Sequence, residues 1–302
     1  MIKGKLTRTL TRTFLYVLLI AVTYVCFFPF LYMIITACKT SADLSDITVN
    51  WIPSTIKLEN FVMAAKAIGY DTGLINTVIM TVLSTLGHLL SCGMAGYALA
   101  RYRFRGQKAV FLIVVVAMII PIQTLIIPSF IMYSKAGMLN SFWPIVLPCF
   151  LGMGLKGGLF VFIFRQFFLR LPKEIEEAAR IDGCSFLGTY FRVVIPMSKP
   201  ILLVVSVLSV VWHWNASYEA EIYISKDHLK PLASRISVIL QYVTNPPEGF
   251  FEQLQSSSSE QVINVAVLMA GCFLILIPII ILFCFVQKYF MQGVERSGLG
   301  GD

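Results

Sequence analysis

The chain has 302 residues, of which 57% are hydrophobic and only 13% are charged, and its mean hydropathy is +0.79. About a quarter of the residues of an ordinary soluble domain are charged, so this composition excludes a soluble enzyme or a soluble binding domain. The formal net charge is +8. The basic residues lie at the ends of apolar runs, so the charge describes membrane topology, and we expect no nucleic-acid partner.

Six uncharged, apolar runs are long enough to cross a bilayer, which requires about 20 residues per helix. We therefore predict an all-α, polytopic membrane protein in contact with lipid. The predicted spans lie near residues 14–37, 73–99, 109–133, 142–164, 200–218 and 263–286. Together they form a transmembrane domain over 14–290, between an N-terminal segment (1–13) and a tail (291–302), with a long external loop at 219–260.

The orientation follows from the lysines and arginines, because cytoplasmic loops carry an excess of them. With six spans, the two termini and the loops near 101–108 and 165–199 share one side. Most of the basic residues are on that side: Lys3, Lys5, Arg8, Arg12, Arg101, Arg103, Arg105, Lys108, Arg165, Arg170, Lys173, Arg180, Arg192, Lys199, Lys288 and Arg296. Both termini are therefore expected to be cytoplasmic.

The sequence contains no P-loop, HExxH or GxSxG motif. The seven cysteines lie mostly in apolar runs without CxxC spacing, so we expect small buried hydrophobes and neither a disulfide framework nor a metal site. His88, His213 and His228 are too far apart in the sequence to predict a cluster. We therefore expect no catalytic residues, no metal and no cofactor.

The segment "ITAC", which ends at Cys38, is similar to a lipoprotein cleavage box. The apolar run before it is longer than the core of a signal peptide, which has about 7–15 residues. An uncleaved first span is favoured, and cleavage is the alternative.

Two patterns within the spans concern packing. Gly87, Ser91 and Ala95 recur every four residues and place small side chains on one helical face, which favours close helix–helix approach. Pro121 and Pro128 interrupt the third span. Prolines free backbone carbonyls, which protein or water must satisfy, so this helix is expected to line a wet region.

A polar segment, "RLPKEIEEAARIDGCSF", stands between two apolar runs. Acidic residues near its start suit the positive end of a helix dipole, and Gly183 suits the left-handed residue that ends a helix. A second helical stretch follows, and Pro196 is expected to stop it before span five. The residues predict a helix–turn–helix that either receives another protein against the small Ala178 and Ala179 or lies at the membrane interface as an amphipathic helix.

The longer segment "EEAARIDGCSFLGTYFRVVIP", residues 176–196, resembles the EAA loop of bacterial ABC-importer permeases. The family pattern is EAA, three residues, Gly, nine residues, then Ile-x-Leu-Pro. Glu177, Ala178 and Ala179 are followed by Gly183 and, at Val193, by the last block, with Val for Ile and Ile for Leu. The stretches "AGYALARYRFRGQK" and "IPIQTLIIPSFIMYSKAGMLNSFWPIVLP" are similar to the carbohydrate-uptake branch, specifically its MalG-like inner-membrane subunit.

This resemblance covers nearly the whole chain and implies the fold of a type I importer permease in the bacterial cytoplasmic membrane. It implies a non-catalytic subunit that works with a MalF-like sister permease, an ATPase dimer and an external sugar-binding protein. The helix–turn–helix, over 171–196, would then dock on the ATPase. The residues that match the motif or flank it are Glu177, Ala178, Ala179, Asp182, Gly183 and Pro196.

A route for sugar requires aromatic platforms and polar side chains. Trp212, Trp214 and Asn215 near the end of span five are candidates, although tryptophans also populate membrane interfaces regardless of function. Residues two apart on a helix point about 200° apart, so at most one tryptophan can face a cavity. Asn76 and Gln123 are weaker candidates, because helix–helix hydrogen bonding explains mid-span amides equally well.

Lys156 is the last candidate. It lies about 13 Å from Arg165 along a continuous helix, and there a lysine is costly unless it faces a cavity or partner. Gly157 and Gly158 would leave open space beside it. Either Lys156 faces the route and favours a sugar bearing a carboxylate, or it snorkels outward or pairs with an acid of the sister subunit.

Two other classes of protein are the alternatives. A permease for peptides or amino acids would share the EAA segment but not the stretches around spans two to four. A membrane glycosyltransferase would present acidic residues for a metal or a nucleotide sugar, and the cytoplasmic loops offer only the acids of the EAA segment.

Overall fold

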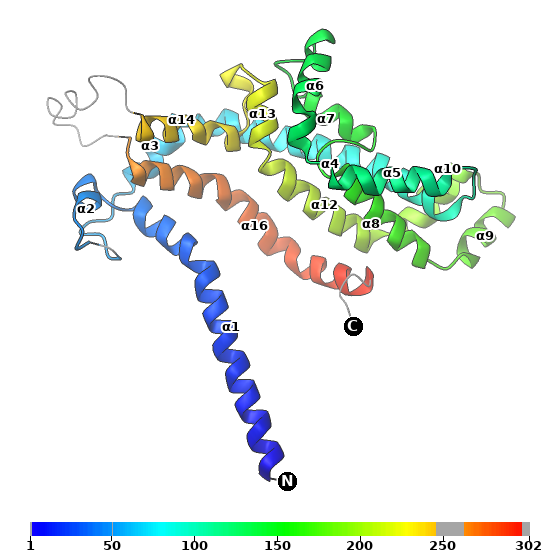
Figure 1. Ribbon diagram of the computed structural model, residues 1–302, viewed down its shortest axis with the longest axis horizontal. Coiled ribbons are helices and arrows are strands. Elements are labelled where there is room, and N and C mark those ends of the chain that lie inside the picture. The colour runs from blue at the N-terminus through cyan, green and yellow to red at the C-terminus, as the bar shows by residue number, and fades with distance from the viewer. Residues whose placement is uncertain (1, 50, 246–262, 298–302) are drawn as a thin grey trace. The chain divides into compact units, whose positions relative to one another are not determined.

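The computed structural model describes residues 2–49, 51–245 and 263–297, and these are helical and irregular with no strand among them. The chain divides into two compact units, one of residues 1–69 and 236–276 and the other of residues 70–235 and 277–302. Helices α14 (Leu232–Thr244) and α16 (Val265–Ser297) each begin in one unit and end in the other. Figure 1 shows the order of the helices along the chain.

The first unit contains α1 (Ile2–Ala37), α2 (Ser41–Ser45) and α3 (Glu59–Ala67). The buried Asn60 donates hydrogen bonds of 2.9 Å to the carbonyls of Ala37 and Lys39, so its amide closes the C-terminal end of α1. The rings of Phe61 and Phe273 meet edge to face, with centroids 5.8 Å apart, and join α3 to α16. The side chains on α1 from Leu10 onward are largely exposed and apolar, as expected of a helix that faces lipid.

The second unit contains most of the described helices. They are α4 (Tyr70–Arg101), α5 (Gln107–Ile119), α6 (Ile122–Lys135), α7 (Trp143–Phe150), α8 (Gly157–Arg170), α9 (Glu174–Ile181), α10 (Phe186–Thr189), a π-helical turn η1 (Tyr190–Val194), α11 (Ile195–Met197), α12 (Lys199–Trp214), α13 (Ser217–Tyr223) and a 3₁₀ turn η2 (Asp227–Leu229).

Helix α4 is the centre of this unit and packs against α7, α8 and α12. The small-residue face predicted on it is confirmed at two positions. A Cβ on Gly87 would meet the backbone nitrogen of Phe150 at 2.9 Å, and the Ser91 hydroxyl donates a 2.6 Å hydrogen bond to the Cys149 carbonyl. A Cβ on Gly96 would lie 2.6 Å from Cβ of Phe164, so α8 also approaches closely. Backbone contact of this kind requires small residues.

Three helices are long and apolar enough to cross a membrane: Leu10–Ala37, Tyr70–Arg101 and Val265–Tyr289. Two further pairs of helices pass the same test when each bent pair is counted as one span. The predicted span at 109–133 is one of these, since α5 and α6 meet at an angle of 101°. Pro121 stands at the break, in extended conformation, because it cannot supply the N–H that a continuous helix requires.

The predicted continuous span at 142–164 is wrong as a single helix. Helix α7 ends at Phe150, and α8 begins only at Gly157. Between them Gly152, Gly154 and Lys156 have positive φ values of 72°, 79° and 63°. Left-handed residues are incompatible with a continuous right-handed helix, and the two glycines adopt that conformation without a Cβ penalty.

Candidate functional site

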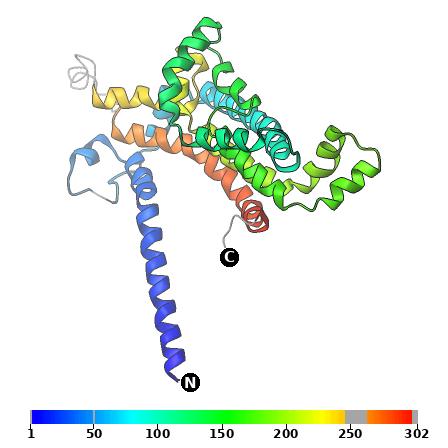
Figure 2. The same cartoon turned by 45° about the vertical axis from the view of Figure 1, so that its right-hand side comes forward.

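The polar segment folds as a helix–turn–helix. Helix α9 is followed by a turn at 182–185 and by a second arm, α10–η1–α11, as Figures 1 and 2 show beyond the end of α8. Gly183 has φ +82°, which confirms the left-handed residue predicted there. Its N–H donates to the Arg180 carbonyl at 3.0 Å, and the N–H of Cys184 donates to the Ala179 carbonyl at 2.9 Å. These two bonds form a complete Schellman motif, which ends α9 and sets the direction of the turn.

Pro196 does not by itself stop the second arm. It lies inside α11, the last turn of the arm, and the helical conformation continues through it to Met197. The arm ends at Met197, and the chain then bends by 82° into α12. The buried Ser198 stands at the bend, and its hydroxyl donates a 2.6 Å hydrogen bond to the Val194 carbonyl.

A buried ion pair fixes α9 against the end of α4. Arg101 Nε donates to Glu176 Oε1 at 2.7 Å, and the Tyr97 hydroxyl donates to Glu176 Oε2 at 2.8 Å. Arg101 Nη2 also donates to the Leu171 carbonyl at 2.7 Å, just before α9. Sequence reasoning missed this anchor. The available signal was the acid immediately before the EAA block and the arginine that closes the second apolar run.

The residues predicted to face a partner lie on different sides of α9. Glu177, Ala178, Asp182 and Gly183 are exposed, whereas Ala179 is buried beside Glu176. The expectation that both alanines open one face is therefore wrong for Ala179, because neighbouring residues on a helix point about 100° apart. Apolar side chains also stand exposed around the turn, with Ile181 86% and Leu187 50% accessible.

A groove of about 580 Å³ runs along the turn and the second arm. It is lined by Asp182, Gly183, Cys184, Ser185, Leu187, Gly188, Phe191 and Arg192. Its lining combines one acidic residue, one basic residue and the apolar side chains of Leu187 and Phe191.

Two of the route candidates come together. The Lys156 ammonium lies 4.6 Å from the centre of the Trp212 ring, a cation–π contact between the start of α8 and the last turn of α12. Both side chains are exposed. The open space expected at the neighbouring glycines is absent, since a Cβ on Gly157 would lie 2.8 Å from the Gly152 carbonyl oxygen and one on Gly158 3.1 Å from that of Val114.

The remaining candidates of spans three and five are not part of this pair. Trp214 is buried at 7% exposure while Trp212 is 41% exposed, so the two tryptophans face different surroundings, as their spacing predicts. Asn215 caps the end of α12 and donates a 2.9 Å hydrogen bond to the Val211 carbonyl. Gln123 is exposed in the first turn of α6.

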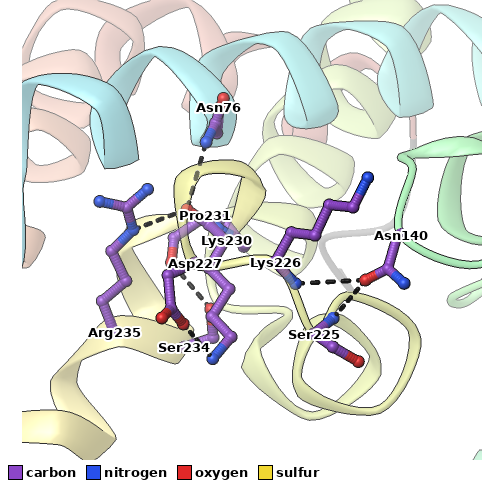
Figure 3. A network of polar contacts seen from close by, with 9 residues as sticks. All are labelled: Asn76, Asn140, Ser225, Lys226, Asp227, Lys230, Pro231, Ser234 and Arg235. Carbon is purple, nitrogen blue, oxygen red and sulfur yellow. Dashed lines mark hydrogen bonds and ion pairs between the residues drawn. The ribbon is translucent and has the colours of Figure 1, made fainter.

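Asn76 is engaged with a loop (Figure 3). Its amide nitrogen donates to the Lys230 carbonyl at 3.3 Å, as Figure 3 shows, and also to the His228 carbonyl at 2.7 Å. Asn140 holds the same loop from the other end, since its side-chain oxygen accepts from the backbone N–H groups of Ser225 and Lys226 at 2.8 and 3.2 Å. The structure thus gives Asn76 hydrogen bonds to a loop, in place of the helix–helix hydrogen bond expected as the alternative for a mid-span amide.

The loop also carries an exposed ion pair between Lys230 and Asp227, 2.7 Å long. The hydrogen bond from Lys230 lowers the pKa of Asp227 below its usual value of 3.8. Arg235 Nε donates to the Lys230 carbonyl at 2.8 Å, so the loop is attached on this side to the start of α14 (Figure 3).

Two histidines lie together in the interior of the second unit, so the expectation that the histidines are too scattered to cluster is wrong for His88 and His213. Their ring centroids are 5.2 Å apart. Cys149 Sγ lies 3.8 Å from His213 Nε2. The three residues come from α4, α7 and α12, and all three are fully buried.

The chain matches a protein family over most of its length. The model of the family described as "Binding-protein-dependent transport system inner membrane component" matches residues 92–296. Among curated proteins, the chain is 31% identical over 283 residues to the arabinooligosaccharides transport system permease protein AraQ of Halalkalibacterium halodurans, covering 93% of each chain. It is also 31% identical over 295 residues to the melibiose/raffinose/stachyose import permease protein MelC of Bacillus subtilis, covering 96% of this chain and 98% of MelC.

The fold is also found among solved structures. The chain superimposes on a subunit of a bacterial ABC transporter involved in the import of the acidic polysaccharide alginate with a TM-score of 0.76. The match covers 91% of this chain and 94% of that one at 24% identity. The all-helical architecture is therefore that of an ABC-importer permease. The chain belongs to the binding-protein-dependent transport system inner membrane component family, the permease subunits of ABC importers.

Proposed function

We propose that this chain is the MalG-like permease subunit of an ATP-driven, binding-protein-dependent sugar importer, with an oligosaccharide as its cargo. Family membership and the two relatives whose names specify oligosaccharide transport support the cargo class. The single structural observation that carries the mechanism is the anchored helix–turn–helix, whose buried face is fixed to α4 by Glu176 and whose other face is exposed.

In this proposal the chain crosses the membrane six times with both termini in the cytoplasm. The three long helices, the bent pair of α5 and α6, and α12 without the second arm that precedes it supply five crossings. The broken pair α7 and α8 supplies the sixth, because α7 holds a continuous apolar sequence and α8 runs on toward basic residues at its end. The excess of Lys and Arg beside the helix–turn–helix supports a position on the cytoplasmic side.

The helix–turn–helix is proposed to couple the permease to an ATPase. Glu177, Ala178, Asp182 and Gly183, with the groove beside them, would contact the ATPase, while the buried Ala179 supports the element from within and Pro196 lies exposed near the end of the second arm. A force on the exposed face would reach α4 through the Arg101–Glu176 ion pair and α12 through the bend at Ser198. Rigid helices joined by buried polar contacts transmit such displacements.

The complete importer would contain an ATPase dimer, a MalF-like sister permease and an external sugar-binding protein. The external loop 219–260 is proposed to meet the binding protein or its sugar. The part of this loop from residue 246 onward lies outside the described residues. The part before it is held in place by hydrogen bonds to Asn76 and Asn140. ATP hydrolysis would belong to the separate ATPase, and this chain would supply half of the route without catalysing a reaction.

Lys156 and Trp212 are proposed to line that route and to favour a sugar that bears a carboxylate. The ammonium group provides a positive charge in a region where charges are costly, and the indole provides an apolar face for a sugar ring. Gln123, Trp214 and Asn215 remain candidates for the route.

The proposal is tested by reconstitution in proteoliposomes. The chain is co-expressed with the sister permease and ATPase encoded with it, and the cognate binding protein is loaded in turn with neutral oligosaccharides, acidic oligosaccharides, peptides and amino acids. ATPase stimulation and uptake with an oligosaccharide are expected. The alternative function, import of peptides or amino acids, predicts stimulation by those ligands alone. Absence of copurifying ATPase would contradict both.

A further inference from the structure

Three side chains that transport does not use lie together in the interior of the second unit. His88, Cys149 and His213 each have 0% accessible surface. One potential ligand atom of each lies within 4.8 Å of the other two. We propose that His88, Cys149 and His213 form a binding site for a soft monovalent cation, copper(I) in chemical class, between α4, α7 and α12.

The spacing suits a shared metal. A cation bound to a sulfur at about 2.3 Å and to a nitrogen at about 2.0 Å in trigonal geometry holds these two atoms about 3.7 Å apart. Cys149 Sγ and His213 Nε2 are 3.8 Å apart without rearrangement. Closing the widest of the three separations requires a movement of about 1 Å, which side-chain rotation supplies.

The surroundings of the histidines also fit. The Met153 carbonyl lies 3.0 Å from His88 Nε2, and the Ser209 hydroxyl lies 3.3 Å from His88 Nδ1. A carbonyl only accepts, so it fixes the proton on Nε2 as the usual outer partner of a metal-binding histidine does, and the lone pair on Nδ1 would bind the metal in place of its contact with Ser209. His213 directs Nε2 toward Cys149 Sγ, and its Nδ1 is buried with no hydrogen-bond partner within the described part of the chain.

Charge balance selects the monovalent ion. When copper(I) binds, the Cys149 S–H bond breaks, an S–Cu bond forms, and the proton leaves to water. The two imidazoles stay neutral and donate lone pairs. One positive charge enters and one leaves, so the site remains neutral. A divalent ion would leave a net charge of +1 among fully buried helices, where an uncompensated charge is strongly disfavoured.

The number and type of donors point the same way. Thiolate with imidazole is a ligand set for copper and zinc, and structural zinc sites usually have four protein ligands. The described residues supply three. Three donors complete the coordination of a trigonal monovalent ion, and the bound ion would cross-link the three helices.

The test uses the full-length chain in its assembled complex. Exposed thiols are first alkylated with N-ethylmaleimide, and mass spectrometry confirms that Cys149 is unmodified. The protein is then loaded with copper(I) under ascorbate, desalted and analysed for metal per chain. Wild-type protein should hold one equivalent more than Cys149→Ser or His213→Gln. The matched control Cys92→Ser removes another fully buried cysteine, outside the cluster, and should load like wild type.

X-ray absorption on the wild-type protein keeps the proposal falsifiable if a variant does not assemble. One sulfur and two nitrogens in the first shell, with an increased Tm on loading, support the site. Equal loading of wild type and Cys149→Ser contradicts it, and so does a shell of sulfur alone. Retention of zinc(II) in direct competition with copper(I) overturns the assignment to a monovalent ion.

Discussion

The guanidinium of Arg101 and the carboxylate of Glu176 form a 2.7 Å ion pair whose side chains are only 3% and 8% exposed. Removing one partner of a buried pair leaves an uncompensated charge and costs about 3–5 kcal/mol. We therefore expect Glu176→Gln to destabilise the attachment of α9 strongly, as a lower Tm and faster proteolysis within 174–185. Glu177→Gln, one residue away and exposed, is the matched control and should leave Tm unchanged. Equal Tm values for the two variants would show that the ion pair is dispensable.

The turn after α9 offers a separate test of coupling. Gly183 has φ +82° and a Cβ there would meet nothing within 4 Å, so a substitution acts through backbone strain rather than collision. Gly183→Val should redirect the second arm, at a cost of about 1–2 kcal/mol, and reduce binding-protein-stimulated ATPase activity and uptake while the protein still inserts.

Gly106 provides the control for that experiment. It has φ +87° with equally open space, and it lies in another loop. Gly106→Val introduces comparable strain and should retain stimulation. Wild-type stimulation and uptake in Gly183→Val would end the coupling hypothesis for this turn.

Packing of α4 against α7 predicts a stability effect independent of transport. A Cβ on Gly87 would lie 2.9 Å from the Phe150 backbone nitrogen and 3.0 Å from the Cys149 carbonyl carbon, and backbone cannot move aside as a flexible side chain can. Gly87→Ala should cost about 1–3 kcal/mol, read as a lower Tm in detergent. Val82→Ala on an exposed face of the same helix should change Tm little. A Tm for Gly87→Ala at or above wild type would contradict the close packing.

Features set by residues that are neighbours in the sequence could be predicted, whereas contacts between residues far apart in the sequence could not. The end of α9 at Gly183 depends on a few neighbouring residues, so local pattern predicts it. The break before α8 also had a local signal, Gly152 and Gly154, but their neighbours are apolar and the run was interpreted as one continuous helix. The anchoring role of Glu176 could not be predicted in this way, because its partner, Arg101, comes from a distant helix.

The cluster of His88, Cys149 and His213 had no signal in the sequence at all. The members are separated by more than sixty residues each, and only the packing of α7 and α12 on α4 brings them together. The same applies to Lys156 and Trp212, whose contact depends on where α8 begins and where α12 ends.

The loop beside α4 is held by the amide of Asn76 and also carries an exposed ion pair, so the two contributions to stability can be compared. Asn76→Ala removes the bonds to the His228 and Lys230 carbonyls and should cost about 1–3 kcal/mol. Asp227→Asn breaks the ion pair with Lys230, yet Asp227 is 89% exposed, so Tm at neutral pH should not change measurably.

The pH dependence has a definite sign. The pKa of Asp227 is lowered in the fold, so the contribution of its ion pair is present above its usual value of 3.8 and is lost as the pH falls through the lower, folded value. The measurement is the Tm of the wild-type protein, Asn76→Ala and Asp227→Asn at neutral and at acidic pH. A larger loss for Asp227→Asn than for Asn76→Ala would show that the ion pair, not the amide, holds the loop.

The position of Lys156 leads to the prediction about cargo. The residue has φ +63°, an uncommon conformation for a lysine, and its ammonium lies 4.6 Å from the centre of the Trp212 ring. Lys156→Met keeps an unbranched side chain of similar length at this positive φ and removes the charge. If the ammonium attracts a carboxylate in the route, uptake of an acidic oligosaccharide should fall about tenfold or more, since a hydrogen bond to a charged group contributes about 1.5–3 kcal/mol. Uptake of a neutral oligosaccharide, complex assembly and basal ATPase activity should be retained.

Trp212→Phe retains an aromatic face and serves as the companion variant, and it should affect the uptake of acidic and neutral cargo alike. Equal losses for acidic and neutral cargo in Lys156→Met, or failure of the complex to assemble, would show that the lysine supports the break between α7 and α8 and does not select the sugar.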